Sequence, residues 1–196
     1  GDLPTALQRA LELDEHGHGD KPLLYTTLAS EFGLSQKVCD LMLSDFWTRY
    51  LRHCSNASPD TRDTLTALRQ RGIKLGIITN GATELQRRKI AALNIEAFFD
   101  TVVISEAEGV RKPDPVIFAR ALARCGVQAH EAVFVGDHPE ADIAGARAAG
   151  LLPIWKRVPY WGLPDGDVLA VDQLSEVLSI CLGPPGASDD DRGSRH

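Results

Sequence analysis

The sequence lacks the features that would point to a membrane or a nucleic acid. Its longest apolar runs, such as KLGIITN and FFDTVVI, are far shorter than the roughly 20 residues that a membrane span needs. It has no recognisable targeting segment. No cluster of Lys and Arg is interleaved with aromatic residues, and the formal net charge is −6. We therefore expect neither a membrane nor a nucleic acid as a partner.

Cysteine is scarce, which argues against a zinc site and against a disulfide framework. The four cysteines form no CxxC pair, and the histidines form no metal-ligand grouping with them or with one another. The cysteines are Cys39, Cys54, Cys125 and Cys181. A reducing, cytoplasmic location is the simplest expectation. No pattern in the sequence indicates the oligomeric state.

The first part of the chain has a helical pattern throughout. Hydrophobic residues make up 43% of the 196 residues, which suits one globular unit with a smaller subdomain. Three segments show apolar residues at spacings of three and four, and two of them end at glycine. They read TALQRALELDEHG, PLLYTTLASEFG and SQKVCDLMLSDFWTRYL. We predict a helical subdomain over residues 1–57.

From residue 58 helices and strands alternate. Ser58 and Pro59 begin a helix that ends at Gly72, and KLGIITN follows as the continuous apolar strand that a covered parallel sheet requires. The further elements are helix 83–93, strand 101–105, helix 114–125, strand 132–137, helix 140–149, strands 152–156 and 168–171, and helix 172–182. This βαβ series predicts an α/β fold with a Rossmann-like, doubly wound parallel sheet over 58–183. The tail 184–196, rich in Pro, Gly and Asp, is expected to fray.

Polar residues gather where the predicted strands end. In open parallel sheets, ligands bind beyond the carboxyl ends of the strands. The strand KLGIITN delivers Thr79, Asn80 and Gly81, and the loop EGVRKPDP contributes Lys112. The Thr79 hydroxyl and the amides near Asn80 and Gly81 can donate to phosphate oxygens, assisted by the helix that follows them. Lys112 adds a point charge, so these four residues are predicted to bind a phosphate group.

The stretch GDHPEAD places carboxylates directly after an apolar strand. Asp137 and Asp142 offer the oxygen ligands that Mg²⁺ prefers, and we predict that they form a metal site. For Glu140 and Asp142 the alternative is a favourable acidic charge at a helix start, worth about 0.3–1 kcal/mol. His138 either contacts the substrate or turns the chain, and the residue types leave both possibilities open.

Three motifs together resemble the haloacid dehalogenase superfamily of hydrolases, in its branch with a helical cap. IITNG, RKPDP and GDHPEAD look like the family's second, third and fourth motifs in order and spacing, and the resemblance covers residues 5–182. It implies a Rossmann-like core, a four-helix cap and Mg²⁺. An Asp would attack phosphorus to form an aspartyl-phosphate, and an Asp two residues later would serve as acid and then base.

The resemblance also assigns roles to individual positions. It implies that Thr79 binds the phosphate and that Lys112 bridges the phosphate and the nucleophile. It further implies that Asp137 ligates the metal and that Asp142 ligates or supports it. The cap residues Asp45, Phe46, Trp47 and Tyr50 could line a substrate cleft, but packing among helices explains Phe46 and Tyr50 equally well.

The family's first motif, an apolar strand followed by Asp-x-Asp-x-Thr, has no counterpart in these 196 residues. The pairs Asp165/Asp167 and Asp189/Asp191 neither follow an apolar strand nor precede a suitably placed Thr, so turns or solvated charge explain them better. In the family this strand lies between the two that correspond to KLGIITN and AVFVGD. Its absence would leave two strand edges unpaired, with buried amides costing about 1–3 kcal/mol each.

Three explanations account for the missing motif. An amino-terminal piece lies outside these 196 residues, or VLSICL fills the gap, or a second chain does. The helical period of DQLSEVLSICL favours the first, in which case the longer protein is the enzyme and this chain alone is inactive.

The leading functional hypothesis is a Mg²⁺-dependent phosphatase acting on a small phosphorylated metabolite. One alternative is a 2-haloacid dehalogenase, which attacks carbon and needs no metal; the acidic GDHPEAD stretch argues against it. The other is a binding or scaffold protein without catalysis, motivated by the missing first motif. Motifs alone do not choose the substrate.

Overall fold

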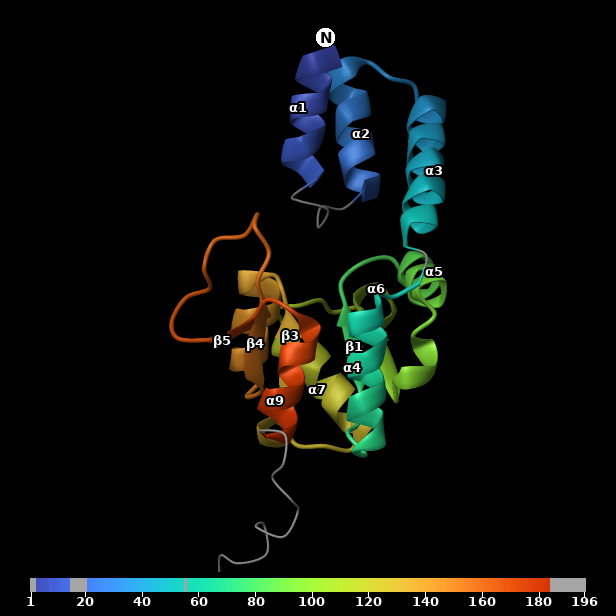
Figure 1. Ribbon diagram of the computed structural model, residues 1–196. Coiled ribbons are helices and arrows are strands. Elements are labelled where there is room, and N and C mark those ends of the chain that lie inside the picture. Colours follow the sequence, from blue (N-terminus) through green and yellow to red (C-terminus); the bar gives the residue numbers. More distant parts are fainter. Residues whose placement is uncertain (1–2, 15–20, 55, 184–196) are drawn as a thin grey trace, which may run out of the picture. The chain divides into compact units, whose positions relative to one another are not determined.

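The computed structural model of the protein describes residues 3–14, 21–54 and 56–183 (Figure 1). The predicted tail 184–196 lies outside the described residues. Contacts divide the chain into two compact units, residues 1–55 and residues 56–196. We call them the helical unit and the core unit.

The helical unit contains a helix at each of the three segments with helical periodicity. They are α1 (Leu3–Asp14), α2 (Lys21–Phe32) and α3 (Gln36–His53). Leu24, Leu28 and Cys39 are its buried apolar residues. Arg9 on α1 pairs with Glu31 on α2, with 3.0 Å between Arg9 Nε and Glu31 Oε2. The prediction of helices is confirmed for the described part of this region, and residues 15–17 of the first predicted segment lie outside it.

The core unit alternates helices and strands. Its strands are β1 (Gly76–Thr79), β2 (Thr101–Ile104), β3 (Val133–Gly136), β4 (Leu152–Lys156) and β5 (Leu169–Val171). Its α-helices are α4 (Pro59–Gln70), α5 (Thr83–Leu93), α6 (Ser105–Glu108), α7 (Pro115–Cys125), α8 (Gly145–Ala148) and α9 (Val177–Leu182). Shorter helical turns are η2 (Glu96–Phe98), η3 (Ala129–Glu131), η4 (Pro139–Ala144) and η5 (Leu174–Glu176).

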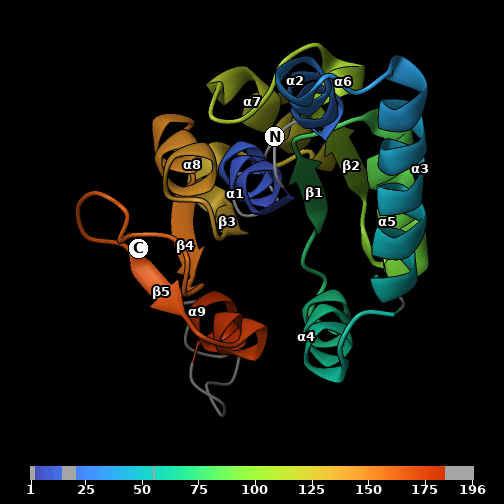
Figure 2. The same cartoon turned by 90° about the horizontal axis from the view of Figure 1, so that it is seen from above.

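The strands pair in parallel but form two sheets among the described residues. β1 pairs with β2, and β3, β4 and β5 form the second sheet in that order (Figure 2). No ladder joins β1 to β3 in this part of the chain. The segment VLSICL is helix α9, so the hypothesis that it fills the place between these strands is wrong. Its apolar residues follow a helical period and pack on one side.

Helices cover both faces of the sheets, which makes the core unit a three-layer α/β structure. On one face, Phe118 of α7 lies in a buried cluster with Val103 of β2, and Ile78 of β1 and Phe134 of β3 pack against it. On the opposite face, β1 and β2 pack against α4 and α5, and β3, β4 and β5 pack against α9. Neighbouring strand residues alternate between the two faces, as the period of two requires.

Asp100 fixes the start of β2 beside β1. Its Oδ2 atom accepts the Leu75 N–H at 2.8 Å and an Arg69 guanidinium N–H at 2.6 Å, and Lys74 Nζ lies 3.4 Å from its Oδ1 atom. The Leu75 hydrogen bond, followed by the nearby Arg69 and Lys74 charges, holds the pKa of Asp100 below its usual value. The folded state therefore binds a proton at this carboxyl less readily than the unfolded chain does.

We expect Asp100→Asn to reduce stability at neutral pH, with an effect that shrinks in acid. Because the folded pKa is depressed, the stabilisation is complete above the unfolded value of about 4 and is lost as the pH falls through the folded value. Urea unfolding of both proteins between pH 7 and pH 2 checks this. Asp63→Asn on the exposed side of α4 is the control, and a pH-independent difference for Asp100→Asn would contradict the prediction.

Candidate functional site

The residues predicted at the carboxyl ends of the strands are linked by hydrogen bonds. The first link joins Asn80, immediately after β1, to the loop before α7. The Asn80 side-chain amide donates to the Lys112 carbonyl at 3.0 Å, and its oxygen accepts the Lys112 N–H at 2.9 Å. Both polar ends of the Asn80 side chain therefore hold the Lys112 backbone, which places the lysine beside the end of β1.

The turn from β1 into α5 is held by two side chains of α6. Gly81 has a φ of +140°, which L side chains rarely adopt, and its N–H donates to Ser105 Oγ at 2.9 Å. The Thr83 N–H, in the first turn of α5, donates to Glu106 Oε2 at 2.7 Å, and this bond lowers the pKa of Glu106. The Gly81 amide, which the sequence predicted to donate to a phosphate, thus donates to α6, as does the Thr83 amide at the start of α5. Thr79 is half-buried at the end of β1.

Lys112 and Asp142 form a buried ion pair. Lys112 Nζ lies 2.6 Å from Asp142 Oδ1, and the two side chains are 11% and 7% exposed. The ammonium also lies 5.2 Å from the centroid of the Phe134 ring, within the range of a cation–π contact. Because water reaches neither side chain well, each charge depends on the other, and on further hydrogen bonds within the protein, for its stabilisation.

Asp142 also folds back onto the residues that follow β3. Its Oδ2 atom accepts the N–H groups of Asp137 and His138, each at 3.1 Å. The carboxylate thus has three donors, counting Lys112. Asp142 therefore joins the lysine to the backbone around Asp137, and Asp137 is the more accessible of the two predicted metal ligands.

The helix that the sequence predicted over 140–149 begins with a wider turn. The His138 carbonyl accepts from Asp142 N at 3.0 Å and from Ile143 N at 3.3 Å, so η4 is a π-helical turn that precedes α8. Such turns are frequent at functional sites. His138 caps it, with Nδ1 accepting the Glu140 and Ala141 N–H groups at 3.2 and 3.1 Å. The imidazole has a defined chain-turning role here, and the Glu140 side chain is exposed.

Two aromatic residues that the sequence did not single out as site residues contact Asp137. The indole N–H of Trp155, in β4, donates to the Asp137 carbonyl at 3.0 Å. The Tyr160 hydroxyl, in the loop after β4, lies 3.4 Å from Asp137 Oδ2. Burial, and then the charge of Asp137, raise the pKa of Tyr160. Both lie in the aromatic-rich stretch WKRVPYWG, residues 155–162, whose composition is the sequence signal that could have found them.

The donor set suits a magnesium ion that keeps most of its water. Mg²⁺ is commonly bound through one or two carboxylates together with waters and substrate phosphate. Asp137 can supply such a ligand, and Asp142 can support it from behind. Among the described residues no group of three or more His, Cys, Asp or Glu side chains could hold a metal ion by itself. These residues therefore suit a Mg²⁺ ion that is shared with a bound phosphate group better than one that is held by protein side chains alone.

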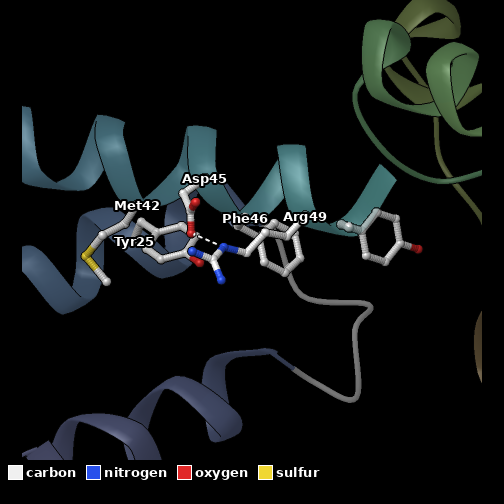
Figure 3. A pocket seen from close by; sticks show the side chains of 6 residues that line it. Tyr25, Met42, Asp45, Phe46 and Arg49 are labelled. Carbon is white, nitrogen blue, oxygen red and sulfur yellow. Dashed lines mark ion pairs between the residues drawn. The ribbon is translucent and has the colours of Figure 1, made fainter. Parts of the chain in front are cut away.

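The helical unit has a hollow of its own, lined by α2 and α3 (Figure 3). Its volume is about 380 Å³, and its lining residues are Tyr25, Met42, Asp45, Phe46, Arg49 and Tyr50. Phe46 stacks on Tyr50 with 5.6 Å between ring centroids, and Arg49 Nε pairs with Asp45 Oδ2 at 2.7 Å. Three of the four cap residues considered from the sequence thus line this hollow, and Trp47 packs edge-on against Phe46.

The class of protein follows from this fold and from comparison with known proteins. A parallel α/β core carries an Asn-held lysine, a buried aspartate and a more accessible aspartate at the strand ends. The family model for haloacid dehalogenase-like hydrolases matches residues 19–150. The chain belongs to this family, as its three motifs predicted.

Several relatives are named as phosphatases. A glyceraldehyde 3-phosphate phosphatase of Methanopyrus kandleri is 48% identical over 128 residues, covering 62% of this chain and 55% of that protein. A phosphoserine phosphatase of Thermus thermophilus is 41% identical over 97 residues, covering 50% and 39%. The chain thus spans about half the length, or less, of these curated relatives.

Solved structures share the fold over most of this chain. A 2-haloacid dehalogenase of Pseudomonas syringae matches with a TM-score of 0.62 at 27% identity, covering 92% of this chain and 80% of that one. A magnesium-bound hydrolase of the family from Bacillus subtilis matches with a TM-score of 0.71 at 22% identity, covering 91% and 80%. No described helix is both long enough and apolar enough to cross a bilayer.

Proposed function

We propose that the protein is a Mg²⁺-dependent phosphatase acting on a small phosphorylated metabolite. The observation that carries the proposal is the linked set at the strand ends, in which Asn80 holds Lys112, Lys112 pairs with Asp142, and Asp142 holds the backbone at Asp137. One cation and two carboxylates lie within one hydrogen-bonded group there. Relatives named for glyceraldehyde 3-phosphate, phosphoserine and ribulose 1,5-bisphosphate support a small phosphate ester as the substrate.

Each predicted residue has a role in this proposal. Thr79 donates its hydroxyl to a phosphoryl oxygen, and the backbone at Asn80 and Gly81 shapes the turn around that group. Lys112 places its charge against the phosphoryl oxygens and bridges them to the attacking carboxylate. When bound, Mg²⁺ neutralises phosphoryl charge and aligns the reacting groups. Asp137 holds it, and Asp142 keeps both Asp137 and Lys112 in place.

The attacking carboxylate comes from the family's first motif, which residues 1–196 do not include. Turnover therefore needs a chain that supplies this motif, and we expect residues 1–196 alone to be inactive. Residues 1–57 would serve as the cap subdomain and residues 58–183 as the core. Four unpaired cysteines support a reducing, cytoplasmic location.

The test compares the gene product that includes the first motif with the chain of residues 1–196. We expect the longer form, with Mg²⁺, to hydrolyse p-nitrophenyl phosphate and at least one of the phosphate esters after which the relatives are named. EDTA should abolish this turnover. Asp137→Ala should lower turnover at least about a hundredfold, whereas Asp165→Ala in the loop before β5 should not. Turnover of a 2-haloacid in EDTA, or no turnover by the longer form, would overturn the proposal.

A further inference from the structure

Asp137 is held at its backbone from both sides. Its N–H donates to Asp142 Oδ2 at 3.1 Å, and its carbonyl accepts the Trp155 indole N–H at 3.0 Å. Both peptide groups flanking the Asp137 side chain are therefore fixed by side chains rather than by a strand ladder, since β3 ends at Gly136. Such bonds restrict the directions in which the carboxylate can point.

Trp155 is placed for this contact by the register of the second sheet. Trp155 pairs with Gly136 in the parallel β3–β4 ladder, and its side chain is buried, with 4% exposure. A buried indole N–H needs an acceptor, and the one it reaches is the carbonyl one residue beyond its ladder partner. Through Trp155, β4 therefore also fixes the backbone of Asp137, the first residue after β3.

Tyr160 contacts the Asp137 carboxylate itself. Its hydroxyl lies 3.4 Å from Oδ2, and its ring packs against Trp161 with 5.9 Å between centroids. Trp161 in turn lies 4.5 Å from the His138 ring, centroid to centroid. The loop after β4 is therefore attached both to Asp137 and to the residue next to it, which keeps the tyrosine beside the carboxylate.

We propose that Trp155 and Tyr160 are positioning residues for Asp137 as a metal ligand. Trp155 sets the backbone of Asp137, and Tyr160 donates to Oδ2, so the two contacts together limit the direction in which the carboxylate points. The inference rests on the proposed function, because it takes Asp137 to be the ligand. Partners that orient a metal ligand commonly change metal affinity by about 10- to 100-fold when they are removed.

The experiment measures Mn²⁺ binding, as a paramagnetic substitute for Mg²⁺, to the 196-residue chain in the presence of inorganic phosphate, by line broadening of backbone amide NMR signals. Broadening should centre on the amides around Asp137 and disappear in Asp137→Asn. Trp155→Phe, which removes the N–H and keeps an apolar ring, should weaken the affinity at least about tenfold. Tyr160→Phe should weaken it several-fold and alter which amides broaden most.

Matched controls separate positioning from folding. Tyr25→Phe and Trp47→Phe make the same chemical changes in the helical unit and should leave Mn²⁺ affinity unchanged. Tyr160 is 42% exposed, so Tyr160→Phe should keep the fold and decide the matter if Trp155→Phe unfolds. The inference would be overturned if Tyr160→Phe showed unchanged Mn²⁺ affinity and unchanged broadening, and if Trp155→Phe, where it folds, also bound Mn²⁺ normally. The assignment of Asp137 as a metal ligand would stand in that case. Absence of binding at Asp137 in the unaltered chain would overturn the metal assignment, and this inference with it.

Discussion

Replacing Asp142 by alanine should lower the free energy of unfolding of the core unit by about 3–5 kcal/mol, the usual cost of breaking a buried pair. The substitution removes the partner of a Lys112 side chain that is only 11% exposed. It also removes the acceptor of the Asp137 and His138 N–H groups. Three donors lose their acceptor at once, and one of them carries a charge.

Urea unfolding of the core unit at neutral pH provides the measurement. The matched control is Glu84→Ala on α5, which breaks an exposed pair with Arg88 at a similar distance, 2.7 Å, and should cost no more than about 1 kcal/mol. Replacing both partners, in Lys112→Met with Asp142→Leu, should recover much of the loss, because no buried charge then remains. A loss below 1 kcal/mol in Asp142→Ala would contradict the burial of the pair.

The helices and strands could be predicted from the sequence because local patterns determine them. The α4 start is an example, since Ser58 accepts the Thr61 N–H at 3.1 Å and Pro59 occupies the first helical turn. The alternation of strands and helices likewise follows from the change of apolar period. These signals lie within a few residues of the structure that they specify.

The contacts within the site could be predicted only in part. Lys112 and Asp142 are separated by 30 residues, and nothing local at either position specifies that the two charges pair. Asn80 was predicted to bind substrate. Its hydrogen bonds to the Lys112 backbone could not be predicted, because they depend on the path of the loop that brings Lys112 back beside β1. The role of Trp155 could not be predicted for the same reason. In LPIWK it fits an apolar strand, and the acceptor of its N–H is the Asp137 carbonyl, which follows a different strand.

Gly136→Ala should be the most damaging small substitution in the core unit, costing about 3 kcal/mol or more. A Cβ at this position would lie 2.5 Å from both Cβ and Cγ of Asp142, closer than real Cβ atoms approach their neighbours. Alanine in a strand is otherwise better than glycine by roughly 0.5–1 kcal/mol, so the expected sign is reversed by this one contact. Moving Asp142 away would also strain its pair with Lys112.

The control is Gly162→Ala, because a Cβ there meets nothing within 4 Å and the change should leave the urea midpoint nearly unaltered. A double-mutant cycle then identifies the cause. In an Asp142→Gly background, which removes the Asp142 Cβ and carboxylate, Gly136→Ala should cost less than about 0.5 kcal/mol, whereas independent sites would keep the full cost. Loss of that cost would mean that β3 ends in glycine because Asp142 must fold back against it to reach Lys112. If the full cost remained, the constraint would lie elsewhere on β3.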